Sequence, residues 1–101
     1  MRSYNVFISG RVTGLPREQA IRNFKRGEKL LLDNTYNYIN PLDLVPEYAT
    51  PKEAMLICLP KLLQCDAILL LNDSKFSEGS LLEEATAKYA KMMIFYEDDL
   101  V

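Results

Sequence analysis

The sequence predicts a small three-layer α/β sandwich, with a parallel sheet of about four strands in the order 2-1-3-4 and helices on both faces. Short segments rich in apolar, aromatic and β-branched residues alternate with longer segments of helical periodicity, which indicates strands joined by right-handed crossovers. The segment 67–71 is apolar throughout, as expected of a strand that is covered on both faces. A chain of 101 residues is expected to form a single domain over residues 1–101.

Two strands and one long helix are predicted in the first half of the chain. Residues 4–9 read as the first strand, and the loop 10–14 follows it. Pro16 suits the first turn of a helix that continues through about residue 32. Residues 36–39 form the second predicted strand. The expected buried stripe of the helix comprises Ala20, Ile21, Phe24, Leu30 and Leu31.

The second half is predicted to continue the alternation. A helix begins at Pro51, and Pro60 within it predicts a kink or a split. The third strand is 67–71, a helix follows over 77–90, and the fourth strand is 91–95. The acidic residues after it are expected to fray. The side chains of the Pro51 helix expected to point inward are Met55, Leu59, Leu62 and Leu63.

Composition excludes several classes of function. The chain has no histidine, which rules out Ser-His-Asp and Cys-His nucleophiles and all histidine-containing metal sites. Cys58 and Cys65 lack zinc-finger spacing, so free thiols in a reducing cytoplasm are expected, with no metal and no cofactor. A net charge of −2 gives no basic footprint for a nucleic acid polymer. No apolar run approaches the length of a membrane span, and no signal-peptide core is present.

The stretch Ser77–Ala90 is the centre of the functional interpretation. It follows an apolar strand and a polar loop, and ligands of open α/β sheets bind at this strand-to-helix end. A helix start also offers free backbone N–H groups and the positive end of the helix dipole. A small anionic or polar ligand is therefore expected here, beside Glu83 or Glu84.

The two glutamates are predicted to differ. Glu84 lies four residues before Lys88 and forms a solvated pair on the surface. Glu83 lies about 60° from the centre of the predicted buried stripe, which makes it the candidate for chemistry. That stripe consists of Leu82, Thr86, Tyr89 and Met93.

Two simpler interpretations stand beside these functional ones. Ser80 and Glu83 match a capping box, in which the Glu83 carboxylate would bond back to the Ser80 N–H. The loop Gly10–Gly14 either brings backbone N–H groups near a phosphate or sugar hydroxyl, or is a plain turn that needs positive φ. It is not the dinucleotide-binding fingerprint, because no third glycine follows at the required spacing.

Four segments together resemble a known superfamily. Val6–Pro16, Tyr38–Pro41, Cys65–Ile68 and Ser77–Glu83 are similar to the nucleoside 2-deoxyribosyltransferase-like superfamily, and most closely to a short bacterial and phage branch called domain of unknown function 4406. The resemblance implies a flavodoxin-like fold, a pocket for a nucleoside or nucleotide, and a homodimer or larger assembly. It also implies cleavage or exchange of an N-glycosidic bond, with Glu83 as the nucleophile. The helix dipole is expected to favour the ionised form of Glu83.

The predicted substrate-binding residues follow strands or begin helices, where pockets of this fold form. They are Ser9, Gly10, Thr13, Gly14, Asn40, Asp73, Ser77, Gly79 and Ser80.

Several positions depart from the superfamily pattern. Phe7 stands where active relatives usually have a tyrosine that contacts the nucleophile, and Cys58 stands where they usually have an aspartate that binds substrate and handles a proton. Arg11 replaces a common proline, and Ser74 replaces a common aromatic residue. The alternative is therefore a non-catalytic nucleotide-sensing or protein-assembly module on the same fold.

Overall fold

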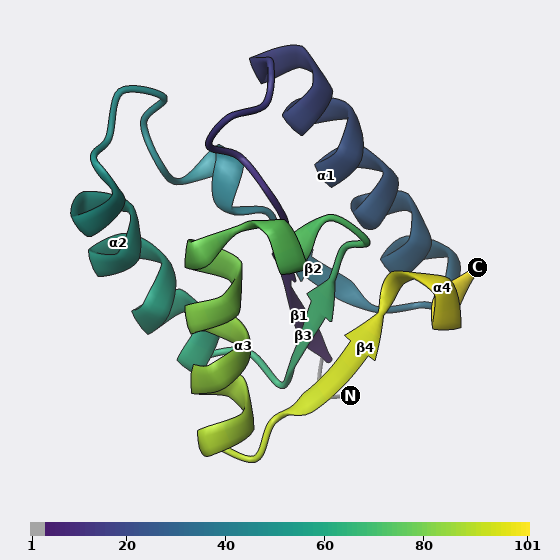
Figure 1. Ribbon diagram of the computed structural model, residues 1–101. Coiled ribbons are helices and arrows are strands. Elements are labelled where there is room, and N and C mark those ends of the chain that lie inside the picture. The colour runs from purple at the N-terminus through teal and green to yellow at the C-terminus, as the bar shows by residue number, and fades with distance from the viewer. Residues whose placement is uncertain (1–3) are drawn as a thin grey trace.

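The computed structural model describes residues 4–101 as a four-stranded sheet flanked by helices (Figure 1). The elements, in chain order, are β1 (Asn5–Ser9), α1 (Arg17–Asp33), β2 (Asn37–Ile39), η1 (Pro41–Asp43), α2 (Pro51–Leu63), β3 (Ala67–Leu70), η2 (Ser74–Phe76), α3 (Glu78–Tyr89), β4 (Met93–Tyr96) and α4 (Glu97–Leu100). None of the helices within residues 4–101 is long and apolar enough to cross a membrane.

The sheet confirms the predicted topology. All three strand pairings are parallel, and the order is β2-β1-β3-β4. β1 lies between β2 and β3, so the segments that follow these three strands emerge at the same edge of the sheet. This edge is where the fold places its ligand-binding loops.

Alternation along β1 divides the core into two layers. Val6 and Ile8 pack with Phe24 and Leu31 of α1 on one face, whereas Phe7 packs on the other face. The side chains that pack with Phe7 come from β3 and from the two helices α2 and α3, which lie side by side in Figure 1; they are Cys58, Leu62, Ile68, Leu70 and Ala87. α1 and α4 cover the first face, and α2 and α3 cover the second.

Two side chains predicted to point inward from helices are exposed, and Pro60 does not split its helix. α2 continues through Pro60 to Leu63 without a split, because a proline near the last turn removes only one internal hydrogen bond. Leu63, predicted to point inward, is exposed, since the buried face is centred on Cys58 and Leu62. Ile21 of α1 is also exposed, because it lies about 100° around the helix from the buried Ala20.

The acidic tail is ordered, contrary to the predicted fraying. Residues 97–100 form α4, and the Glu97 carboxylate is buried. It accepts two hydrogen bonds from the Arg26 guanidinium, 2.7 Å from Nε and 3.1 Å from Nη2, and a third from the Asn72 N–H at 3.1 Å. Hydrogen bonding to Glu97, only partly offset by burial, raises the pKa of Arg26. Bidentate pairing and a backbone donor therefore hold the tail against α1.

Candidate functional site

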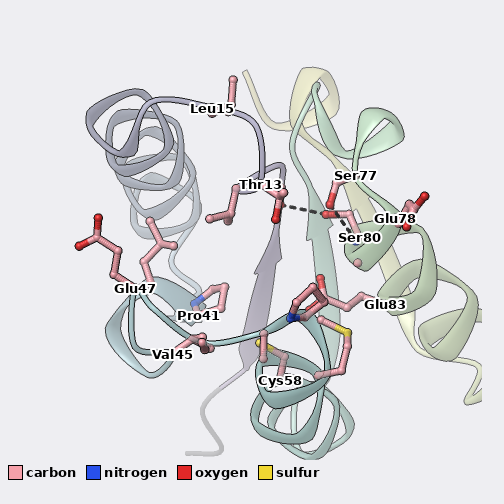
Figure 2. A pocket seen from close by; sticks show the side chains of 18 of the residues that line it. Thr13, Leu15, Pro41, Val45, Glu47, Cys58, Ser77, Glu78, Ser80 and Glu83 are labelled. Carbon is pink, nitrogen blue, oxygen red and sulfur yellow. Dashed lines mark hydrogen bonds between the residues drawn. The ribbon is translucent and has the colours of Figure 1, made fainter.

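A pocket of about 750 Å³ lies at the carboxyl ends of the central strands, between the Gly10 loop, the segment before α2 and the start of α3 (Figure 2). Its volume falls within the roughly 300–1,000 Å³ usual for small-molecule sites. Residues 41–58 supply much of the apolar lining, and the start of α3 supplies polar lining. The residues that line the pocket include Gly10, Thr13, Arg17, Val45, Glu47, Met55, Cys58, Phe76, Ser77, Glu78, Gly79, Ser80 and Glu83.

Glu83 is the buried carboxylate of this pocket. Its side chain extends from α3 into the space above Cys58 in Figure 2, and only 5% of the residue is exposed. The Ser9 hydroxyl donates a hydrogen bond of 2.7 Å to Oε1 of Glu83. Burial raises the pKa of Glu83 to about 7, and hydrogen bonding from Ser9 and Cys58 lowers it by less. The helix dipole was predicted to favour the ionised form of Glu83, but the loss of solvation on burial has the larger effect on its pKa.

The orientation of α3 differs from the prediction. Leu82, Tyr89 and Met93, assigned to the buried stripe, are 47%, 91% and 56% exposed. The buried face instead carries Ser80, Glu83 and Ala87, spaced three and four residues apart. Small side chains let α3 approach the sheet closely, and Glu83 consequently lies at the centre of the buried face rather than at its margin.

The capping-box interpretation of Glu83 is wrong. The helix is capped by Ser77, whose Oγ accepts a hydrogen bond of 3.1 Å from the Ser80 N–H. The Ser80 hydroxyl donates instead to the Gly10 carbonyl oxygen at 3.0 Å, which ties the start of α3 to the end of β1. Because the Ser80 N–H is already capped by Ser77, the Glu83 carboxylate is free to accept the Ser9 hydrogen bond and to line the pocket.

The predicted substrate-binding residues divide into two groups. Five of them line the pocket together with Glu83, and Ser9 donates a hydrogen bond to that carboxylate. The five are Gly10, Thr13, Ser77, Gly79 and Ser80. The other three, Gly14, Asn40 and Asp73, are absent from the lining and act on the framework around it.

Framework roles are clear for these three residues. Asn40 donates through Nδ2 to the buried Glu28 carboxylate at 2.8 Å, and its Oδ1 caps η1. Asp73 accepts a hydrogen bond of 3.1 Å from the Arg11 N–H and so fixes the Gly10 loop. Gly14 has a φ of 86°, a conformation that favours glycine. The plain-turn interpretation thus holds at Gly14.

Sequence reasoning missed two parts of the pocket. Cys58 was considered only as a replaced helper, yet its side chain lines the pocket beside Glu83. Burial, and then the neighbouring Glu83, raise the pKa of the Cys58 thiol to about 12, so it stays protonated at neutral pH. Val45 was missed because the segment before α2 was predicted only as a loop, and Met55 was predicted to point inward but not into a pocket.

A comparison with models of protein families places the chain. Residues 4–96 match the model of the Domain of unknown function (DUF4406). The chain belongs to this family. A comparison with curated proteins found no match.

The DUF4406 chain shows no cluster of three or more Cys, Asp or Glu side chains that could hold a metal ion within its described residues, 4–101. A carboxylate held by a serine hydroxyl, at a pKa of about 7, is half ionised near neutral pH and can act as a nucleophile or as a base.

Proposed function

We propose that this DUF4406 protein binds a nucleoside, a nucleotide or a related ribosyl ligand in the pocket, and that Glu83 cleaves or transfers its N-glycosidic bond. The observation that carries the proposal is the buried Glu83 carboxylate, hydrogen-bonded to Ser9 and lining a pocket with both polar and apolar residues. The resemblance to the nucleoside 2-deoxyribosyltransferase-like superfamily supports it, because Glu83 takes the position of the nucleophile there.

The proposed reaction proceeds through a glycosyl-enzyme ester. Ionised Glu83 attacks the anomeric carbon as the bond to the base nitrogen breaks, and the electron pair leaves with the base, which then takes a proton. Water hydrolyses the ester, or a second base accepts the sugar. The Ser9 hydroxyl orients the carboxylate toward the sugar, since it holds Oε1 at 2.7 Å.

A non-catalytic binding module is the second candidate, and Cys58 is the observation that favours it. The thiol occupies the position at which active relatives carry a proton-handling aspartate. With a pKa of about 12, it does not exchange a proton efficiently near neutral pH. Such a module would bind the same ligand and leave the glycosidic bond intact.

The proposal predicts a ligand-dependent rise in thermal stability. A ligand that binds only the folded state stabilises it by about 2.7 kcal/mol at a hundred times its Kd. We expect at least one member of a panel of common ribo- and deoxyribonucleosides and their 5′-monophosphates to raise the Tm, with release of free base followed by chromatography. A panel that shifts no Tm would contradict both candidate functions, whereas a shift without base release would favour the binding module.

We also propose a cytoplasmic homodimer that covers the outer surface of α3 and the β4 edge. Tyr89 is 91% exposed there, Leu82 and Met93 are also exposed, and β4 is one of the two edge strands of the sheet. Free Cys58 and Cys65 suit a reducing compartment.

The dimer predicts a specific response to substitution. Tyr89→Glu is expected to raise the dimer Kd by about tenfold or more, as loss of a buried tyrosine anchor does at interfaces. Leu32→Glu is the matched control, because Leu32 is exposed on α1, which covers the other face of the sheet. We expect this substitution to leave the dimer Kd unchanged. Light scattering over a concentration series tests both, and a wild-type protein that is monomeric at tens of micromolar would refute the dimer.

A further inference from the structure

The charged side chains around the pocket are predominantly acidic. Among the described residues, the lining includes the carboxylates Glu47, Glu78 and Glu83 but only one cation, Arg17. In Figure 2, Glu47 and Glu78 lie on opposite sides of the pocket, with Glu83 between them. Glu47 and Glu78 are both exposed, so a ligand with its own negative charge would approach a rim of the same sign.

Three backbone donors near the pocket are already engaged by the protein. The N–H groups that this fold usually offers to a phosphate lie in the loop after β1 and at the start of α3. Here the Arg11 N–H donates to the Asp73 carboxylate at 3.1 Å. The Ser80 N–H donates to Ser77 Oγ at 3.1 Å, and the Leu81 N–H donates to the Ser77 carbonyl oxygen at 2.9 Å. A phosphate bound here would have to compete for these three donors.

Two further cations lie near the pocket but outside its lining. Arg11 folds back so that its Nε donates to the Thr13 carbonyl oxygen at 3.2 Å. The Lys75 ammonium lies over the exposed ring of Phe76, 5.4 Å from its centroid. Neither side chain lines the pocket. The Asp73 carboxylate, which accepts a hydrogen bond from the Arg11 N–H, adds a further negative charge beside the Gly10 loop.

From this distribution of charge and donors we infer that the pocket selects an uncharged nucleoside and discriminates against its phosphate esters. This inference rests on the proposed function and narrows it to one substrate class. The polar lining of the pocket suits sugar hydroxyls, which donate to carboxylates, while Val45, Met55 and Phe76 supply apolar surface for a base.

The test compares nucleosides with their matching 5′-monophosphates by titration calorimetry at about pH 8, where ordinary carboxyl groups are ionised. We expect the best-bound nucleoside to bind about tenfold more tightly than its monophosphate, the size expected for a like charge near a protein surface. This gap is expected to narrow as the salt concentration rises from about 20 mM to about 500 mM, because the rim charges are exposed to screening.

A double variant sharpens the comparison. Glu47→Gln with Glu78→Gln keeps the size of two exposed side chains and removes their charge, so the affinity for the monophosphate is expected to rise by about tenfold relative to that for the nucleoside. Glu84→Gln is the matched control, because that carboxylate pairs with Lys88 at 2.9 Å and lies outside the lining. A wild-type protein that prefers the monophosphate would overturn this inference and leave the proposed function standing. Binding of neither class would overturn both.

Discussion

Glu83→Gln is expected to reduce base release from a nucleoside by on the order of 10³-fold or more, because the amide cannot form the glycosyl ester. The substitution keeps the size of the side chain and an oxygen that can accept the Ser9 hydrogen bond, so ligand binding should persist. Glu84→Gln, one residue further along α3, should retain the wild-type rate because Glu84 is paired with Lys88. Single-turnover measurements with the bound nucleoside separate chemistry from binding.

The same reaction has an expected pH dependence. Attack requires the ionised carboxylate, and burial raises the pKa of Glu83 to about 7. The rate should therefore rise through neutral pH and level off above it, with an apparent pKa near that value. Base release that persists in Glu83→Gln, or a rate that falls across this range, would assign the chemistry to another group.

The fold could be predicted in detail because its signals are local. Alternating strand and helix patterns, together with the apolar run at β3, were sufficient for a parallel sheet in the order 2-1-3-4. The bounds of β4 shifted, because the strand begins at Met93 after Lys91 takes a φ of 57°. The order of α4 was not predictable, because the acidic segment has no local signal and depends on Arg26, which is 71 residues away.

The site was predicted only in part because the orientation of α3 was assigned from apolar residues. Leu82 and Tyr89 suggested the wrong buried face, while the true face carries Ser80, Glu83 and Ala87. A pattern of small residues flanking a glutamate at helical spacing was the available signal for close packing. The neighbourhood of Cys58 and Glu83 depends on how α2 packs against α3, which no local pattern in the sequence specifies.

The free energy of unfolding provides a second large expected effect, one that needs no substrate. The pKa of Glu83 is raised from 4.5 to about 7 in the folded protein, so the folded state holds this proton more tightly than the unfolded chain. Between these two values the unfolded chain ionises first, and the contribution of Glu83 to stability falls as the pH rises. Glu83→Gln removes this penalty, and it should therefore stabilise the protein above pH 7 by about 2–3 kcal/mol more than it does near pH 4.

Urea unfolding of wild type and Glu83→Gln over a pH series measures this difference directly, because only the change between pH values matters and any constant effect of the amide cancels. Glu84→Gln is again the control, since its half-exposed ion pair should give no comparable pH-dependent gap.

Parallel stability curves for wild type and Glu83→Gln would show that Glu83 ionises in the folded protein as it does in the unfolded chain. In that case burial would not set its charge, and the rate of base release should no longer depend on pH near neutrality. A gap that opens between pH 4.5 and about 7 would instead show that the fold tolerates a poorly solvated carboxylate at the pocket. Such a cost to stability is typical of a side chain retained for function rather than for packing.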